Sequence, residues 1–206
     1  MPTPIAPLPL GLPDGTAPRL ALVFSGHMAD LPDRTTPRLP EALMPAAGLA
    51  IRAVLDRLDA GPADLALTQG AAGGDLLFAE ACVARGVPVR LLLPLPEPVF
   101  IERSVAPSAG DWVERYRRLR GQLAVAPAVL PGSPQSDDAD VFERCNRWLL
   151  DTALGSGSAQ VHLIGLWNGA VGDGPGGTAH MMDEARRRGG QVTWIDTRRL
   201  ASARRV

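Results

Sequence analysis

Two glycine-rich stretches have the residue types and spacing best suited to binding chemistry. Residues 70–75 read Gly-Ala-Ala-Gly-Gly-Asp, and residues 172–178 read Gly-Asp-Gly-Pro-Gly-Gly-Thr. Each stretch follows an apolar run that predicts a buried strand, and each precedes a helical pattern. Glycines let the backbone close around an anion, and the first amides of the following helix point at that anion. The two stretches therefore predict a pocket for a nucleotide or a sugar phosphate.

The second stretch also has the spacing of a dinucleotide-binding loop, through Gly172, Gly174 and Gly177. Asp196 ends the next predicted strand, 19 residues after Gly177, and in a dinucleotide-binding unit such a carboxylate accepts a ribose hydroxyl. A glycine-rich connection needed only for a tight turn is the alternative. Thr178 either caps the helix or binds phosphate, and the sequence leaves both roles open.

Polar side chains near the predicted strand ends add candidates for the same pocket. His27 ends the series Ser25-Gly26-His27, directly after the first predicted strand, where a parallel sheet presents ligand contacts. Asp75 lies in the first turn of a helix, which favours a carboxylate even without a ligand. Asp173 would repel a bound phosphate, so we expect it to point outward or to reach a sugar hydroxyl. Ser104 is a further candidate, from the segment after the third strand.

Strands and helices alternate along the chain. Apolar runs predict strands at residues 20–24, 64–68, 88–93, 124–130, 161–167 and 191–196. Helical patterns cover residues 45–59, 75–85, 99–104, 111–123, 140–154 and 179–188. This alternation predicts an α/β fold, a Rossmann-like three-layer α/β/α sandwich with a mostly parallel sheet of about six strands. We expect a flexible proline-rich leader over residues 1–18, a single domain over 19–200 and a basic tail over 201–206.

Composition excludes several classes of function. The formal net charge of −1 gives no basic surplus for nucleic acid, and no apolar run is long enough to span a membrane. No signal peptide is recognisable, so we expect a cytoplasmic protein. All 21 basic residues are arginine, which excludes a Walker-A lysine and a Schiff-base lysine. The two cysteines lack CxxC spacing, and no residue spacing suggests a metal site, so we expect neither metal nor cofactor.

The ordered series of motifs resembles the SLOG superfamily. The series comprises Ser25-Gly26-His27, residues 70–75 with Glu80, Leu93-Pro94, Ser104-Val105 and Trp112, Asn146, Leu166-Trp167 and residues 172–178. That superfamily includes the cytokinin-activating phosphoribohydrolases (LOG proteins), the DNA-processing protein DprA and bacterial nucleotide-sensor domains, and the similarity to the sensors is strongest. It covers residues 20–197. The resemblance implies a Rossmann-like fold that binds a nucleotide or a nucleotide-derived second messenger. The ligand-binding residues that it implies are Ser25, Gly26, His27, Gly70, Ala72, Gly73, Gly74, Asp75, Ser104, Asp173, Gly174, Gly176, Gly177 and Thr178.

One departure from the family bears on catalysis. The phosphoribohydrolases read Pro-Gly-Gly-x-Gly-Thr-x-x-Glu, whereas this chain reads Pro-Gly-Gly-Thr at residues 175–178, with Met181 three positions after the threonine. A thioether cannot act as a base. We therefore expect a sensor-type binding domain, and the alternative is a LOG-like nucleoside 5′-monophosphate phosphoribohydrolase or another N-glycosidase. If the chain is such a hydrolase, the candidates for its catalytic carboxylate are Glu80, Asp183 and Glu184. The sequence leaves open whether the chain is an enzyme. The expected partner is a nucleotide or a nucleotide-derived small molecule. The sequence leaves open whether the chain also binds an effector protein and whether it forms a homo-oligomer.

Overall fold

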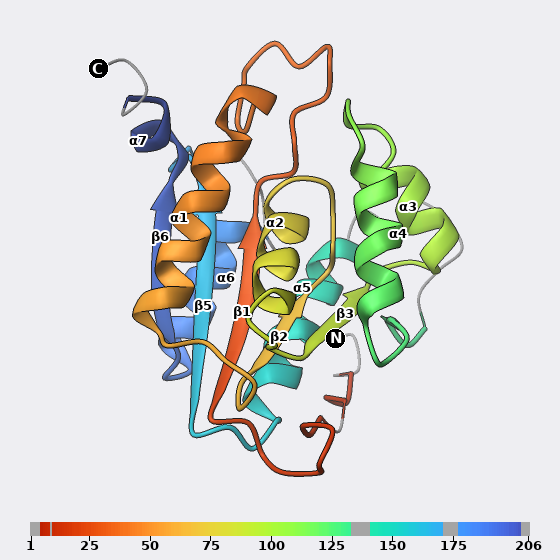
Figure 1. The fold of residues 1–206 in the computed structure, drawn as a ribbon, viewed down its shortest axis with the longest axis vertical. Helices are drawn as coiled ribbons and strands as arrows, with labels where there is room; N and C mark the ends of the chain where they lie inside the picture. The colour runs from red at the N-terminus through yellow and green to blue at the C-terminus, as the bar shows by residue number, and fades with distance from the viewer. Residues whose placement is uncertain (1–4, 9, 133–140, 171–176, 203–206) are drawn as a thin grey trace.

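A computed structural model describes residues 5–8, 10–132, 141–170 and 177–202. Within these residues the chain forms a six-stranded, all-parallel sheet in the order β4-β3-β2-β1-β5-β6 (Figure 1), which confirms the predicted α/β fold. The strands are β1 (Leu20–Gly26), β2 (Leu65–Thr68), β3 (Val89–Leu93), β4 (Ala128–Val129), β5 (Gln160–Trp167) and β6 (Gln191–Asp196).

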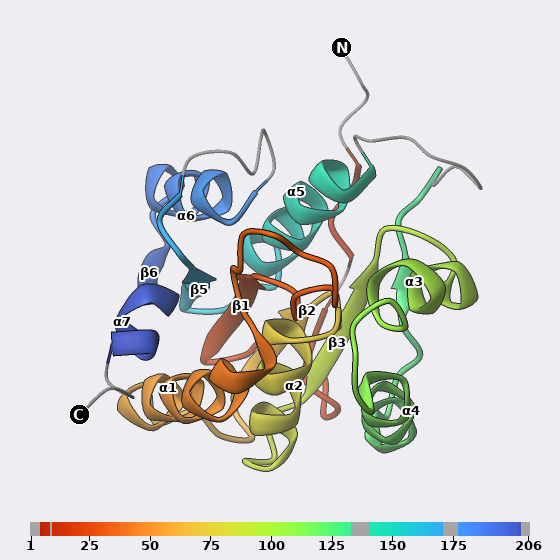
Figure 2. The same ribbon diagram turned by 90° about the horizontal axis from the view of Figure 1, so that it is seen from above.

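Helices cover both faces of this sheet. They are η1 (Glu41–Leu43), α1 (Met44–Arg57), α2 (Gly74–Val83), α3 (Glu97–Ser104), α4 (Trp112–Gln122), α5 (Val141–Leu154), α6 (Thr178–Arg187) and α7 (Thr197–Ser202). Seen from above in Figure 2, α1 and α2 lie on one face, and α5 and α6 lie on the other. The pair α3 and α4 lies at the end of the sheet formed by β3 and β4.

The core forms because the central strands are apolar along their whole length. The first six residues of β1 are all buried, and only the terminal Gly26 is partly exposed, as expected for a parallel strand covered on both faces. Phe24 of β1 stacks on Phe78 of α2, with ring centroids 5.0 Å apart. On the other face, Trp148 of α5 is almost fully buried. These contacts hold the carboxyl end of β1 firmly between two helix layers.

The strand order reverses beside β1, and that reversal fixes the place for a ligand. From β1 the chain builds β2, β3 and β4 on one side, and then returns to build β5 and β6 on the other. β1 and β5 pair in parallel from Leu20↔Gln160 to Gly26↔Leu166, so their carboxyl ends lie at the same edge. In open parallel sheets such a switch point leaves a crevice where ligands bind.

Several local expectations differ from the structure. Part of the segment expected to be a flexible leader packs on α5: the Ala6 carbonyl accepts a hydrogen bond from Trp148 Nε1 at 3.1 Å. Its apolar residues, spaced between prolines, are partly buried against the core. The fourth strand shortens to two residues, since only those pair with Leu92 and Leu93 of β3. The helix α7 follows β6 directly and was not predicted. The domain boundaries stay a prediction.

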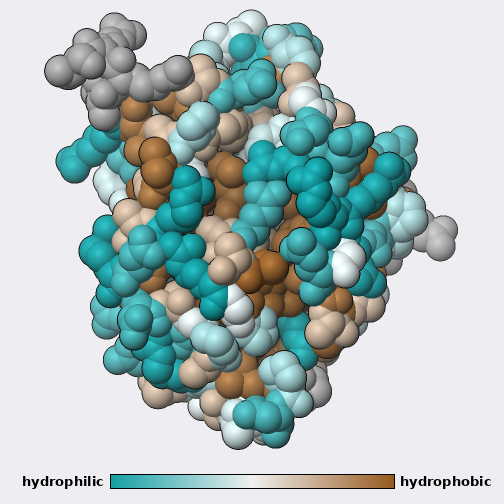
Figure 3. All heavy atoms as spheres, viewed as in Figure 1, coloured by the Kyte–Doolittle hydropathy of each residue, from teal (hydrophilic) through white to brown (hydrophobic). Residues whose placement is uncertain are grey.

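The face of the molecule seen in Figure 3 carries both hydrophilic and hydrophobic side chains. In Figure 3, hydrophilic side chains cover most of the face formed by α1, α2 and α4, and hydrophobic areas lie between them. Among the residues that the structure describes, no helix has both the length and the apolar character needed to cross a membrane.

Candidate functional site

A pocket of about 600 Å³ opens at the carboxyl ends of β1 and β2, at the switch point of the sheet. Its volume falls in the range of small-molecule sites in proteins, about 300–1,000 Å³. Segments far apart in the sequence meet there, because parallel strands present their carboxyl ends at one edge. Seven of the predicted ligand-binding residues line it: Ser25, Gly26, His27, Asp75, Ser104, Gly177 and Thr178.

One wall of the pocket is formed by the start of α6. Gly177 is the N-cap, and Thr178 is the first residue of the helix. Gly177 has no side chain with which to cap the helix, and Thr178 Oγ1 accepts a hydrogen bond from Ser25 Oγ, 3.1 Å away and buried. The pair joins the end of β1 to α6. Two adjacent hydroxyls at a helix N-terminus suit an anionic or hydroxyl-bearing ligand group.

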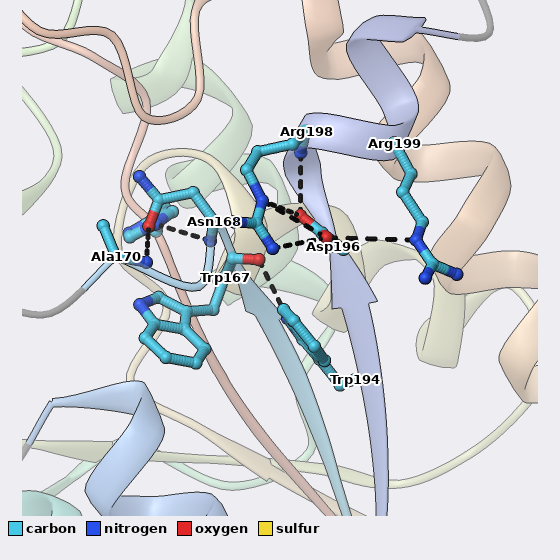
Figure 4. A network of polar contacts seen from close by, with 8 residues as sticks. Trp167, Asn168, Ala170, Trp194, Asp196, Arg198 and Arg199 are labelled. Carbon is cyan, nitrogen blue, oxygen red and sulfur yellow. Dashed lines mark hydrogen bonds and ion pairs between the residues drawn. The ribbon is translucent and has the colours of Figure 1, made fainter.

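His27 connects the end of β1 to the segment that follows β5. Its Nε2 accepts a hydrogen bond from the Asn168 backbone N–H at 3.2 Å. A ring nitrogen that accepts a hydrogen bond carries no proton, so the proton of the neutral imidazole lies on Nδ1. Asn168 Oδ1 in turn accepts from the Ala170 N–H at 3.0 Å (Figure 4). His27 thereby positions the chain at the entry to the second glycine-rich stretch.

Asp75 is a carboxyl group buried at the floor of the pocket. Its side-chain Oδ2 accepts a hydrogen bond from the Ala71 N–H at 3.2 Å. Burial nevertheless dominates over this favourable contact and raises the pKa of Asp75 from 3.8 to about 7. Desolvation disfavours the charged form of an acid, which is the cause of this shift. A carboxyl that titrates near neutrality inside a pocket can donate or accept a proton or a hydrogen bond there.

The first glycine-rich stretch does not form the expected phosphate cradle. Gly70, Ala72, Gly73 and Gly74 are outside the pocket lining. The amides of this loop already donate within the protein: Ala72 N–H to the Ser104 carbonyl at 2.9 Å and Gly74 N–H to the His27 carbonyl at 3.2 Å. A ligand contact of these four residues stays a prediction, and the structure places them behind the pocket lining.

The reason for the glycines in this loop is a close approach of two backbone segments. Gly73 forms an isolated antiparallel β-bridge with Met28. Its φ is +98°, and a Cβ atom at this position would lie 2.3 Å from the Ala29 backbone nitrogen. Gly70 likewise has a φ of +88°. Both positions lie in the left-handed region that glycine alone adopts readily. The loop serves to fasten the segment after β1 to the segment after β2.

Two amide side chains complete the floor and were not predicted as binding residues. Gln69 Nε2 donates a hydrogen bond to Asn146 Oδ1 at 2.6 Å, joining the end of β2 to α5. Both line the pocket. Gln69 directly precedes Gly70 at a strand end, so the rule that singled out His27 would have found it. Asn146 lies inside a helix, where only the family resemblance pointed to it.

The three catalytic candidates do not reach this pocket. Glu80 forms a two-pronged ion pair with Arg115 of α4, through Nε at 2.9 Å and also through Nη2. Asp183 pairs with Arg186 at 3.0 Å on the surface of α6. Glu184 pairs with Arg187 on the same helix. The lining of the pocket at the switch point contains none of the three, although Glu80 and Arg115 line a separate hollow of about 550 Å³ between α2 and α4.

Asp196 also has a structural role. It accepts two hydrogen bonds from the Arg198 guanidinium, at 3.0 and 2.8 Å, and this contact lowers the pKa of Asp196. Figure 4 shows the pair at the end of β6, beside Trp194, whose Nε1 donates to the Trp167 carbonyl at 2.9 Å. Asp196 does not line the pocket, and its contact with a ribose hydroxyl stays a prediction.

The remaining sequence candidates lie outside the described residues. These are Asp173, Gly174 and Gly176, in the second glycine-rich stretch. In the part of the chain that is described, no group of three or more His, Cys, Asp or Glu side chains is arranged to hold a metal ion. Cys82 and Cys145 are both buried, free thiols.

Comparisons with known proteins give a limited result. No protein-family model matches the chain, and no curated protein matches it. Among solved structures it is similar to DNA processing protein A (DprA) from Streptococcus pneumoniae, with 13% sequence identity and a TM-score of 0.41. That match covers 90% of this chain and 61% of the other, so this chain spans less than two thirds of that protein. The fold and the pocket themselves define a Rossmann-like α/β domain with a polar cleft at its switch point.

Proposed function

We propose that this chain is a nucleotide-binding domain of the SLOG type, which holds a nucleotide or a nucleotide derivative in the pocket at the switch point. The observation that supports this most directly is the convergence of Ser25, His27, Asp75 and Thr178 on one cavity. They come from three distant chain segments and offer hydroxyl, imidazole and carboxyl groups. Such a set suits a ligand with sugar hydroxyls, a heterocyclic base and an anionic group.

The proposed ligand places a phosphate at the start of α6. The second glycine-rich stretch precedes this helix, and the helix N-terminus attracts anions through its unpaired amides and its dipole. The Ser25–Thr178 hydroxyl pair lies at the same point and supplies further hydrogen-bond donors. The domain acts as a cytoplasmic sensor that passes ligand occupancy to an effector protein.

A panel of nucleotides tests this proposal through two simultaneous readings. Thermal unfolding reports which ligand stabilises the protein, and mass spectrometry reports whether that ligand is altered. Ser25→Ala combined with Thr178→Val should weaken the binding of the stabilising ligand by about tenfold, since hydroxyl contacts contribute about 1 kcal/mol or more. The matched control is Thr193→Val, which removes a hydroxyl that contacts His162 at 2.8 Å outside the pocket lining. Equal losses in both variants would refute the proposed site.

The alternative function is hydrolysis of an N-glycosidic bond in a nucleoside monophosphate. One observation favours keeping it: Asp75 is a buried pocket carboxyl with its pKa raised to about 7, in the range that suits a general acid. The mass-spectrometric reading distinguishes the two functions. Release of free base, abolished in Asp75→Asn, would establish the enzyme. Stabilisation by a ligand that stays intact supports the sensor.

A further inference from the structure

Helix α5 presents two side chains to the pocket one turn apart. Phe142 and Asn146 are four residues apart, so they lie on the same face of the helix, and both line the pocket. Gln69, at the end of β2, also lines the pocket and donates a hydrogen bond from Nε2 to Asn146 Oδ1 at 2.6 Å. An aromatic ring and an amide side chain therefore belong to the same side of the pocket.

The Gln69 amide is oriented by this contact and keeps hydrogen-bonding capacity for a ligand. Only 9% of Gln69 is exposed. The contact with Asn146 uses one of the two Nε2 hydrogens, and within the described residues it is the one hydrogen bond of the Gln69 side chain. The Oε1 atom has no partner in the described part of the chain and is not sealed in the core, so it opens to the pocket. A carbonyl oxygen in this position selects a ligand group that donates a hydrogen bond.

Phe142 offers an aromatic surface beside this amide. Phe24 also lines the pocket, but it is 2% exposed and its ring stacks on Phe78 within the core. Phe142 is half-buried and packs against the edge of the core, which leaves part of its ring facing the pocket. Aromatic side chains stack on the flat faces of nucleobases. A ring and an amide together can hold a planar heterocycle by its face and by its edge.

The spacing between this side of the pocket and the start of α6 suits a nucleotide. Thr178 lies over β5, since a Cβ atom added to Gly165 would lie 3.3 Å from Thr178 Cγ2. Gln69 follows β2, and β1 lies between β2 and β5 in the sheet. Two strand spacings amount to about 10 Å, a length that a phosphate, a ribose and a base span together. Figure 2 shows α5 and α6 on the same face of the sheet, where they contact each other.

From this geometry we infer that Gln69 and Phe142 form the base-binding end of the pocket and select a purine that carries an N–H donor on its edge. The inference rests on the proposed function and names the ligand class of the same site. Gln69 Oε1 accepts the N–H of the base, Phe142 stacks on its rings, and Asn146 is a positioning residue that fixes the Gln69 amide. A purine covers more of the Phe142 ring than a pyrimidine does. A base without an N–H donor leaves the buried amide carbonyl unpaired, which costs affinity.

Calorimetric titration of nucleoside 5′-monophosphates tests the inference. The probes are AMP, GMP and purine riboside 5′-monophosphate, whose base has no N–H donor, with CMP and UMP as the pyrimidine probes. We expect AMP or GMP to bind the wild-type protein about tenfold tighter than purine riboside monophosphate. In Gln69→Leu this ratio should fall to about unity. In Phe142→Ala every purine nucleotide should bind about tenfold more weakly, with the ratio retained.

Two further variants check the assignment of roles. Gln191→Leu is the control, because this exposed glutamine at the start of β6 is outside the pocket lining, and it should keep the wild-type ratio. Asn146→Asp keeps an acceptor for Gln69 Nε2 and should retain the ratio, whereas Asn146→Leu should reduce it. Equal ratios in the two Asn146 variants would contradict the positioning role.

The outcomes separate the inference from the proposed function. If the wild-type protein binds purine riboside monophosphate as tightly as AMP and GMP, or prefers CMP or UMP, the inference is overturned and the nucleotide-binding function stands. A ratio that survives in Gln69→Leu overturns it as well. If none of these nucleotides binds, the proposed function is wrong and the inference is wrong with it. The wild-type comparison needs no variant, so a substitution that impairs folding does not remove the test.

Discussion

Replacing Asp75 by Asn should change how the stability of this protein depends on pH. The folded chain holds the Asp75 proton with a pKa of about 7, against an ordinary value of 3.8. Since the folded state binds this proton more tightly than the unfolded state, the free energy of unfolding falls as the pH rises from about 4 to about 7. At 1.36 kcal/mol for each pH unit, the full loss amounts to roughly 4 kcal/mol. That is a large share of the roughly 5–15 kcal/mol typical of folded proteins, about a quarter or more.

Urea unfolding followed by circular dichroism between pH 4.5 and 8 measures this contribution. The wild-type protein should lose stability as the pH rises through this interval, and Asp75→Asn should lose much less because an amide does not titrate. Asp183→Asn is the control: it removes an exposed carboxylate paired with Arg186, and it should leave the wild-type slope unchanged. Parallel curves for wild type and Asp75→Asn would refute the reasoning, because they would mean that the buried carboxyl ionises as it does in water.

Three further predictions address the frame of the site. Gly73→Ala should destabilise the fold by about 3 kcal/mol or more in the same unfolding assay, whereas Gly189→Ala, with a positive φ but open space around it, should cost only about 1 kcal/mol. His27→Phe removes the acceptor for the Asn168 N–H, so the hydrogen exchange of that amide, measured by NMR, should accelerate; an unchanged rate would contradict the tautomer assignment. Glu80→Gln should leave nucleotide affinity within about twofold, since its partner is Arg115 outside the pocket; a tenfold loss would reinstate it as a site residue.

The sequence was sufficient to predict the main elements because their signals are local. The apolar run at residues 20–24 and the glycine series that follows it correspond to β1 and its end. Helix α7 carries no such signal: it begins at Thr197 directly after β6, without a turn that would mark its start. The short β4 is defined by its pairing with β3, and pairing between distant segments is not visible in one sequence.

The site was predictable in part, for a related reason. Ser25 and His27 at the end of β1 and Thr178 at the start of α6 line the pocket, because parallel topology brings strand ends and the following helix starts to one edge. The sequence pattern does not distinguish a glycine needed for close approach of a ligand from one needed, like Gly73, for close approach of Ala29. The ion pair of Glu80 could not be predicted because its partner, Arg115, lies 35 residues away along the chain.

The Asp30 carboxylate accepts hydrogen bonds from the backbone N–H groups of Arg38 and Leu39 and so closes residues 30–39 into a loop. One side of this loop faces the pocket, and its other side borders a second hollow of about 250 Å³ shared with η1, α1 and Trp112. Residues 31–38 belong to no strand and contribute no side chain to the main core. Substitutions at the exposed positions of this loop should therefore cost the fold less than substitutions in the strands beside it.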